Sequence, residues 1–202
     1  MIRRETRKTP IRRYSIPSRP AAGRYRNSYM QDSAARPFRL LLLRHARSSW
    51  ALPGQRDFDR ALDDTGYAEA ELIAEMAADR GIRPELILCS PAVRCRQTAE
   101  PFFRIVSEDL EIRYVDELYT GPASVYTDII DAHRHLSSLM IVGHNPMIDE
   151  LFHRLAGNEV ATDALAHGYP PAALAILDMQ AGAGSGAAAT LVSLMLPTRE
   201  PK

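Results

Sequence analysis

The sequence predicts an α/β fold of three layers, in which helices cover both faces of a mainly parallel central sheet. Two observations lead to this prediction. From Phe38 onward, short apolar runs alternate with stretches whose apolar residues recur at helical spacing. The last two apolar runs follow one another without a helix between them, which gives the order β-α-β-α-β-α-β-α-β-β.

The first strand of this order is expected at 40–43. Its four leucines are too few for a helix and apolar enough for a strand that is buried on both faces. The next stretch, "DDTGYAEAELIAEMAADRG", has an apolar stripe at helical spacing. It predicts a helix that is capped by Asp64 or Thr65 and ends at Gly81.

A second strand is expected at 86–89. Pro91 suits the first turn of the helix that follows, and Pro101 is expected to kink or end that helix. The Gly-rich "QAGAGSGAAA" is expected to form a flexible turn between the last two strands. The remaining elements are a strand at 112–115, a helix at 123–132, a strand at 138–144, a helix that Gly157 ends, and strands at 173–179 and 190–196.

The 202-residue chain divides by charge into a short basic segment and a long acidic one. Residues 1–37 hold nine arginines and Lys8 but only Glu5 and Asp32 as acids. Of the 25 basic and 25 acidic residues, 38–202 therefore keep 15 and 23, a net charge of −8. We expect a disordered N-terminal extension over 1–37, where the chain has no sustained apolar period, and a single domain over 38–202. An acidic domain gives no reason to expect nucleic-acid binding.

The N-terminal extension is open to three interpretations. Met30 could be the true start of the protein, with the upstream residues a wrongly assigned extension. The segment could instead be a solvated tail that is made with the protein. It could also be an Arg- and Ser-rich organellar transit peptide, although Pro10, Pro17 and Pro20 would disrupt an amphipathic helix.

Neither a membrane span nor a secretory signal is evident in the sequence. The longest apolar run falls well short of the roughly 20 residues that cross a bilayer, and no segment has the apolar core of a signal peptide. Cys89 and Cys95 lie within one strand-to-helix unit, too close together to cross-link a fold. These features favour a reducing compartment, and we expect a cytoplasmic protein with no membrane association.

Polar residues of one chemical type follow three of the expected strands. Arg44 and His45 follow the first, Ser90 and Arg94 follow the second, and His144 follows the strand at 138–144. Because chemistry in such sheets gathers at the carboxyl ends of parallel strands, we expect these side chains to meet at one edge of the sheet.

Two guanidinium groups near two imidazoles suit a dianionic tetrahedral group. Arginine forks bind phosphoryl oxygens in pairs and stay charged at any working pH. A neutral imidazole can attack phosphorus, and a second histidine, if protonated, can stabilise the oxygens of the transition state. Taken singly, each of these residues also has a structural explanation, such as a hydrogen-bonded histidine or a solvated helix arginine. Their common position at strand ends favours a phosphoryl-transfer site.

Several motifs in order along the chain resemble the histidine phosphatase superfamily, the phosphoglycerate-mutase-like group, and within it the short SixA-like phosphohistidine phosphatase branch. They are "LLLRHARSSW", "DFDRALDDTGYAEA", "ILCSPAVRCRQTAEPF", "DELYTG" and "MIVGHNPMIDELFHRLAG". The resemblance extends from residue 39 to about 157 and more weakly to the end. It implies a phosphoglycerate-mutase-like fold.

The resemblance implies a role for each of several residues. His45 is similar to the nucleophile that becomes phosphorylated, Arg44 and Arg94 to the arginines that clamp the phosphate, and His144 to the second histidine of the phosphate pocket. Ser48 stands where the family often has a small hydroxyl residue that contacts the phosphoryl group. Two further positions stay open: Arg60 could line the pocket rim or form a surface salt bridge, and Glu117 could be the proton donor or a solvated loop carboxylate.

Three departures from the family pattern narrow the choice of branch. Ala46 replaces the glycine of the usual Arg-His-Gly, a change that the short branch often shows. Ala51 stands where mutases of the superfamily place an asparagine, which argues against a mutase. Asn145 follows His144, so the His-Asp pair that supplies the acid in the phytase-like branch is absent.

The sequence therefore predicts a hydrolase that forms a phosphohistidine intermediate and removes phosphate from phosphohistidine on a protein. The short spacing of the motifs leaves no room for a cap domain, so the site should admit a phosphorylated protein as partner as well as a small phosphorylated metabolite. One alternative is a broad-specificity small-molecule phosphomonoesterase with the same site. Another is a catalytically weak module that binds phosphate or phosphoproteins. No metal or cofactor is expected, His133 and His135 being too isolated to form a metal site, and the oligomeric state stays open.

Overall fold

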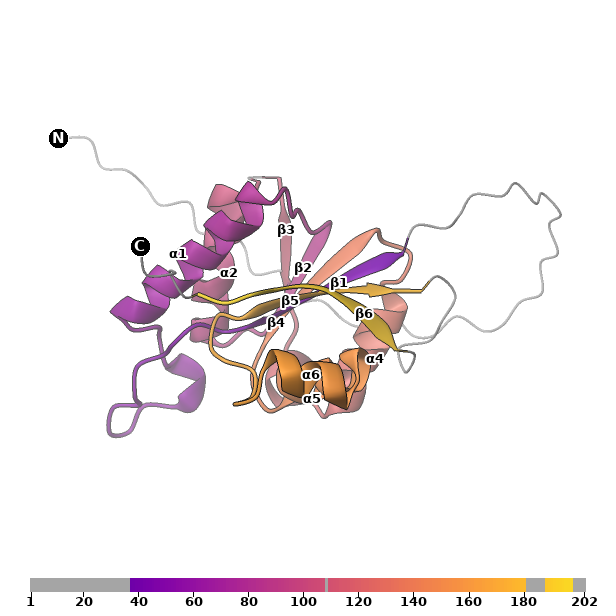
Figure 1. Ribbon diagram of the computed structural model, residues 1–202. Helices are drawn as coiled ribbons and strands as arrows, with labels where there is room; N and C mark the ends of the chain where they lie inside the picture. The colour runs from indigo at the N-terminus through magenta and orange to yellow at the C-terminus, as the bar shows by residue number, and fades with distance from the viewer. Residues whose placement is uncertain (1–36, 108, 181–187, 198–202) are drawn as a thin grey trace, which may run out of the picture.

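The computed structural model describes residues 37–107, 109–180 and 188–197. Its centre is a six-stranded sheet (Figure 1). The strands are β1 (Phe38–Arg44), β2 (Leu86–Cys89), β3 (Glu111–Tyr114), β4 (Ser138–Gly143), β5 (Leu174–Met179) and β6 (Ala189–Met195). They lie in the order β3-β2-β4-β1-β5-β6, in which the first four are parallel and β5 runs antiparallel to both of its neighbours. The mainly parallel α/β sheet expected from the sequence is thus confirmed.

Helices cover both faces of this sheet (Figure 1). They are α1 (Asp64–Asp79), α2 (Val93–Ile105), α3 (Glu117–Thr120), α4 (Ala123–Ala132), α5 (Met147–Ala156) and α6 (Asn158–Ala164), with a 3-10 turn η1 at Asp57–Asp59. One buried cluster joins α1 and α2 to one face, and a second joins α4, α5 and α6 to the other. These two clusters make the three layers that the sequence predicts.

Strand β1 supplies both layers of the core. Leu40 and Leu42 belong to the cluster under α4 and α5, whereas Leu41 and Leu43 belong to the cluster under α1 and α2. Successive side chains of a strand point to opposite faces, and both faces of β1 are covered, so all four leucines are completely buried. Pairing with β4 on one side and β5 on the other also satisfies the backbone of β1.

Helix α1 begins at Asp64, so its N-cap lies one residue before the predicted cap. Asp63, rather than Asp64 or Thr65, is the N-cap, and its carboxylate accepts a hydrogen bond from the backbone N–H of Gly66 at 2.8 Å. The predicted end at Gly81 is confirmed. This glycine has φ of 66°, and its N–H and that of the next residue bond back to the carbonyls of the last turn, which is a Schellman arrangement.

Pro101 does not end helix α2, which continues to Ile105. A proline inside a helix removes one hydrogen bond. Pro101 is buried, however, and Ala99 and Phe102 on the same turn pack in the cluster between the sheet and α1, so packing holds the turn. Three short helical segments, η1, α3 and α6, were not expected from the sequence, because they are too short to show a helical period.

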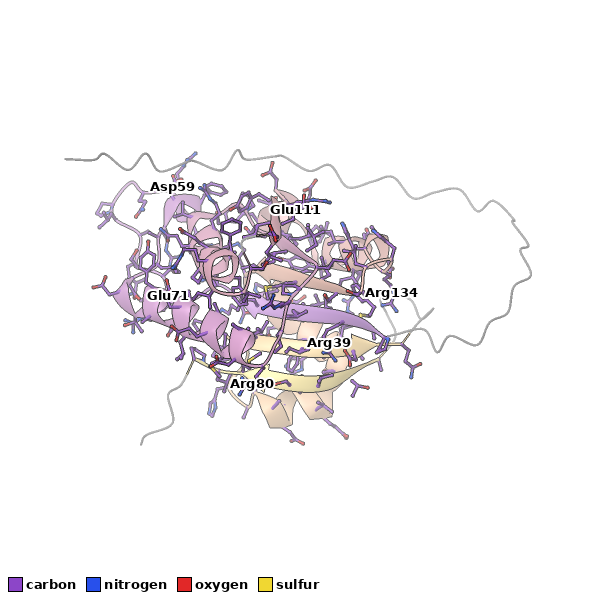
Figure 2. The ribbon with its side chains drawn as sticks, turned by 90° about the horizontal axis from the view of Figure 1, so that it is seen from above. Arg39, Asp59, Glu71, Arg80, Glu111 and Arg134 are labelled. Carbon is purple, nitrogen blue, oxygen red and sulfur yellow. The ribbon has the colours of Figure 1, made fainter. Side chains whose placement is uncertain are left out.

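Ion pairs join the elements at the surface of the domain, where Figure 2 labels Arg39 and Glu71 among the charged side chains. Arg39 at the start of β1 makes a two-fold hydrogen bond to Asp178 of β5, with both distances at 2.8 Å. Arg104 of α2 pairs with Glu71 of α1. Exposed pairs of this kind contribute little to stability, on the order of 0 to 1 kcal/mol each, so the two buried clusters carry the fold.

Two expectations fall outside the described residues: the disordered extension over 1–37, apart from residue 37 itself, and most of the Gly-rich turn, at 181–187. Within the described part of the chain, no helix has the length and the apolar character needed to cross a membrane.

Candidate active site

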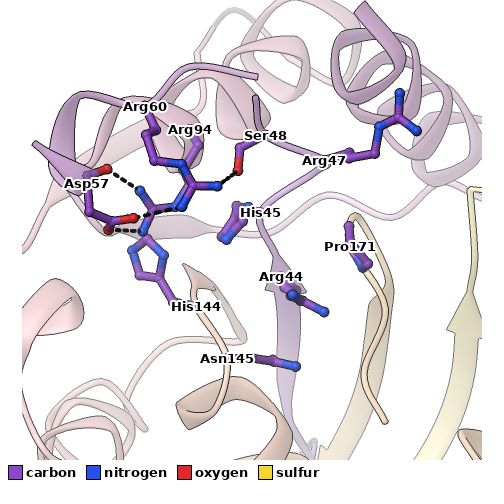
Figure 3. A pocket seen from close by; sticks show the side chains of 10 residues that line it. All are labelled: Arg44, His45, Arg47, Ser48, Asp57, Arg60, Arg94, His144, Asn145 and Pro171. Atoms are coloured by element: carbon purple, nitrogen blue, oxygen red, sulfur yellow. Dashed lines mark hydrogen bonds and ion pairs between the residues drawn. The ribbon is translucent and has the colours of Figure 1, made fainter. Parts of the chain in front are cut away.

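A cavity of about 440 Å³ lies at the carboxyl ends of three neighbouring strands, β1, β4 and β2 (Figure 3). The adjacency of these strands in the sheet explains why the polar residues that follow them meet, as the sequence predicts. The cavity is lined by Arg44, His45, Arg47, Ser48, Asp57, Arg60, Arg94, His144, Asn145 and Pro171. Six of the seven predicted site residues are in this group.

His45 is held at the end of β1 with one ring nitrogen fixed. Its backbone N–H bonds to the carbonyl of Gly143 on the adjacent strand at 3.0 Å. Its ring Nδ1 lies 2.8 Å from the carbonyl oxygen of Ala46, so Nδ1 carries a proton and donates it. Burial, together with the positive charges of Arg94 and Arg44, lowers the pKa of His45 to about 4, although the Ala46 carbonyl opposes this. At neutral pH the ring is therefore uncharged, with a lone pair on Nε2.

His144 follows β4, and its ring centroid lies 5.2 Å from that of His45. Its Nε2 is 2.8 Å from the hydroxyl of the buried Ser90 and 3.4 Å from the sulfur of Cys95. Burial and the charge of Arg94 lower the pKa of His144 to about 3. The second histidine, which the sequence suggested could act in protonated form, is thus neutral at pH 7.

Arg44 is the last residue of β1, and the residues around Tyr169 hold its side chain. One terminal nitrogen of Arg44 donates to the carbonyl of Tyr169 at 2.6 Å, and the Tyr169 hydroxyl donates to the backbone of Leu42 at 2.6 Å. Burial lowers the pKa of Arg44 from its ordinary value. Its Nε is buried and has no hydrogen-bond partner among the described residues.

Arg94 lies in the first turn of α2, and its guanidinium is engaged by Asp57 (Figure 3). One terminal nitrogen donates to the Asp57 carbonyl at 2.7 Å and the other to the Asp57 carboxylate at 2.9 Å. Only 7% of the Arg94 side chain is exposed, against 51% for Asp57. Although burial opposes it, hydrogen bonds from Arg60 and Arg94 lower the pKa of Asp57 to about 2.

Ser48 and Arg60 both line the cavity and contact each other. Arg60 donates from Nη2 to the Ser48 hydroxyl at 2.8 Å, from Nε to the Ser49 carbonyl at 3.0 Å, and from Nη1 to Asp57 at 2.8 Å. The sequence left Arg60 between a pocket rim and a surface salt bridge. The structure shows both, since its ion pair with Asp57 forms part of the cavity wall.

Glu117 is the one predicted site residue that the structure does not place in the cavity wall. It begins the short helix α3 and is partly buried. Two residues further on, Tyr119 faces the site instead: its hydroxyl donates to Asp57 at 3.1 Å, and its ring lies edge-on to that of His144. Sequence position alone could not show which residue of this single turn points toward the cavity.

Four residues of the cavity wall were not predicted as site residues. Asp57 had a signal in the sequence, because it stands three residues before Arg60, the spacing of a local ion pair. Asn145 directly follows His144, and Arg47 stands two residues after His45. Pro171 lies in the segment that leads into β5. Their side chains enter the cavity wall only because these loops fold over the strand ends.

The charges of the cavity wall suit an anion. Four arginines line it and only one carboxylate, Asp57, among the described residues. Guanidinium forks bind phosphoryl groups with good geometry, and the two neutral imidazoles add a nucleophile and a hydrogen-bond donor or acceptor. No group of three or more His, Cys, Asp or Glu side chains that could hold a metal ion occurs within the described ranges.

The sequence of the chain is similar to those of known proteins. The family model of the histidine phosphatase superfamily (branch 1) matches residues 40–120. An uncharacterized chloroplastic protein of Arabidopsis thaliana is 33% identical over 146 residues, which cover 65% of this chain and 67% of that protein. An uncharacterized protein of Mycobacterium tuberculosis is 30% identical over 140 residues, or 67% of this chain and 85% of that protein.

Solved structures share both the fold and part of the sequence. A crystal structure of an Agrobacterium tumefaciens protein that carries the name phosphohistidine phosphatase SixA has a TM-score of 0.73 and 42% identity, and the match covers 80% of this chain and 99% of that one. The protein histidine phosphatase SixA solved with tungstate has the same fold, with a TM-score of 0.66, 20% identity and coverage of 79% and 97%. The chain therefore belongs to the histidine phosphatase superfamily, in its SixA-like branch. Membership of this superfamily and branch supports a phosphatase, as the sequence predicts.

Proposed function

We propose that the protein removes the phosphoryl group from phosphohistidine on another protein, and that it does so through a phosphorylated His45. The observation that carries the proposal is the state of His45. Its Nδ1–H is tied to the Ala46 carbonyl and its pKa is about 4, so a neutral imidazole presents Nε2 to a cavity lined by arginines. A neutral, oriented imidazole is the form that attacks phosphorus.

The proposed reaction has two steps. Nε2 of His45 attacks phosphorus, the bond from phosphorus to the leaving nitrogen breaks, and Arg44 and Arg94 hold the phosphoryl oxygens as charge shifts onto them. The leaving nitrogen takes up a proton from solvent. A water molecule then attacks the phosphorylated His45, the phosphorus–nitrogen bond electrons return to the ring, and the water gives up one proton to the phosphate that is released. His144, within reach of the same oxygens, contributes a ring N–H, while Ser90 hydrogen-bonds to its other side.

The shape of the site supports a protein as substrate. The cavity lies at the surface, and the loop from Ser49 to Arg56 beside it projects into solvent, with Trp50 91% exposed. A phosphorylated side chain on a bulky carrier can therefore approach. The 42% identity to the Agrobacterium protein named as a phosphohistidine phosphatase points to the same substrate class.

The test uses three substrates and one variant. Wild-type protein and His45→Ala are incubated with a protein carrying phosphohistidine, with p-nitrophenyl phosphate and with phosphoglycerate. We expect the wild type to form an acid-labile phosphoenzyme, to hydrolyse phosphohistidine fastest, and to lose at least about 10³-fold of its activity in His45→Ala.

Other results would lead to other conclusions. Faster turnover of phosphoglycerate or p-nitrophenyl phosphate than of phosphohistidine would favour a broad small-molecule phosphomonoesterase. Tight phosphate binding without turnover of any substrate would favour a binding module. Equal turnover by wild type and His45→Ala would remove His45 from the mechanism altogether.

A further inference from the structure

Asp57 is a carboxylate at the mouth of the cavity that the proposed two-step reaction does not use. It is the only Asp or Glu in the cavity wall within the described part of the chain, and half of its side chain is exposed. Three side chains donate to its carboxylate: Arg60 at 2.8 Å, Arg94 at 2.9 Å and Tyr119 at 3.1 Å. A role must therefore be found for a negative charge in a cavity wall that is otherwise rich in arginine.

The position of Asp57 relative to His45 is informative. The two residues lie on opposite sides of the guanidinium groups of Arg60 and Arg94 (Figure 3). In phosphoryl transfer the attacking and leaving atoms stand roughly in line, on opposite sides of phosphorus. A phosphoryl group that these arginines hold against His45 therefore directs its leaving atom away from His45, toward the side of the cavity where Asp57 lies.

We propose that Asp57 donates the proton to the leaving group, and that the cavity can therefore hydrolyse alkyl phosphate esters as well as phosphoramidates. This inference rests on the proposed function, since it assigns the proton donor of the same site. It gives Asp57 the role that the sequence suggested for Glu117, which lies outside the cavity wall.

The proton balance of the two steps is complete. In the first step, Nε2 of His45 bonds to phosphorus, the phosphorus–oxygen bond to the leaving group breaks, and its electron pair takes the proton from the Asp57 carboxyl. In the second step, the Asp57 carboxylate accepts a proton from water as the water oxygen bonds to phosphorus. The phosphorus–nitrogen bond then breaks and its electrons return to His45, so the net reaction is hydrolysis of the ester.

Binding of the substrate should favour the protonated form of the Asp57 carboxyl. Hydrogen bonds from Arg60 and Arg94 stabilise the charged carboxylate, while Tyr119 and the nearby His144 are uncharged. A bound phosphoryl group takes hydrogen bonds from the same two arginines and brings negative charge next to Asp57. Both changes favour the protonated carboxyl.

Leaving-group chemistry provides the test, because acid help matters most where the leaving group is most basic. The wild type, Asp57→Asn and the matched control Asp59→Asn are assayed on β-glycerophosphate, p-nitrophenyl phosphate and phosphoramidate. Asp59 is two residues away on the same turn, and within the part of the chain that the structure describes its carboxylate pairs only with the exposed Arg56. Thermal unfolding of each variant checks that it is folded.

In Asp57→Asn we expect kcat/KM on β-glycerophosphate to fall about 100-fold, with a loss on the other two substrates at least tenfold smaller. Asp57→Glu should restore part of the β-glycerophosphate activity, and Asp59→Asn should match the wild type. Equal losses on all three substrates would mean that Asp57 only positions the arginines, and would overturn the inference. So would unchanged β-glycerophosphate turnover, or a wild type that hydrolyses p-nitrophenyl phosphate but no alkyl ester. A wild type that hydrolyses none of these substrates, and phosphohistidine no better, would instead contradict the proposed function.

Discussion

The cavity is built from two regions that are held in place in different ways. The strand-end region, defined as Arg44, His45 and His144, continues from β1 and β4, and backbone hydrogen bonds to neighbouring strands fix it. The loop region, defined as residues 48–60, is fixed mainly by side-chain contacts such as those of Arg60 with Ser48 and Asp57. Much of the loop region is exposed, whereas the four leucines of β1 and the apolar residues of β4 behind the strand-end region are completely buried.

This difference fits the role that is proposed for each region. A nucleophile needs one fixed orientation, and a strand that is paired on both sides and buried on both faces provides it. The charged groups of the loop region must exchange contacts among themselves for contacts to a ligand. Ion pairs between side chains can do this at low cost, because exposed pairs contribute little to stability.

Arg94 contacts the loop region from helix α2, and removal of its side chain should cause a large loss of activity. We expect Arg94→Ala to lower kcat/KM on p-nitrophenyl phosphate by about 10³-fold, because a buried donor to the developing charge is lost. Arg56→Ala is the matched control, since among the described residues this exposed arginine of the loop region pairs only with Asp59, and its loss should change activity less than twofold. Retention of activity within tenfold in Arg94→Ala would show that the loop region does not depend on α2 for phosphate binding.

The stability of the fold should depend strongly on the buried strands behind the strand-end region and hardly at all on the loop region. Leu42→Ala removes a completely buried side chain behind the strand-end region, so we expect the free energy of unfolding to fall by about 3 kcal/mol. Trp50→Ala removes the largest side chain of the loop region, but 91% of it is exposed, so the loss should be below about 0.5 kcal/mol. Chemical denaturation of both variants gives these values. A larger loss for Trp50→Ala than for Leu42→Ala would reverse the comparison.

A pH series tests the strand-end region alone. His45 has a pKa of about 4 in the folded protein and 6.5 as its ordinary value, and the pKa of His144 is lowered to about 3. Between these values the unfolded chain binds more protons than the folded one. The free energy of unfolding is therefore fully retained above about pH 6.5 and falls as the pH drops toward 4.

The expected loss is on the order of 4 kcal/mol, roughly 2 kcal/mol for each of the two histidines, measured by denaturation at pH 7 and pH 5 in a buffer without phosphate or sulfate. A His45→Gln/His144→Gln variant should show a shallower dependence on pH, with the remainder due largely to His133, whose pKa burial also lowers. An equal dependence in this variant and the wild type would place the titrating groups outside the strand-end region.

The residues of the strand-end region could be predicted from the sequence, whereas the residues that act in the loop region could be predicted only in part. The runs of buried residues in β1, β2 and β4 are local patterns, and the residues that follow them are read directly from the chain. Parallel strands place those residues together regardless of loop details, which is why Arg44, His45, Arg94 and His144 were found. Ser48 and Arg60 were found through the family resemblance rather than through any local pattern.

The sequence by itself determined the order of the elements, the buried strands and the four residues at the strand ends, because hydrophobic periodicity is a local property of the chain. Only the tertiary structure placed Asp57 in the cavity wall, set Glu117 outside it and brought Tyr119 to His144. Those positions depend on contacts between segments far apart in the chain, such as the bond from Arg94 to Asp57, and no local pattern encodes them. The neutral state of both histidines likewise follows from burial beside arginines of other elements.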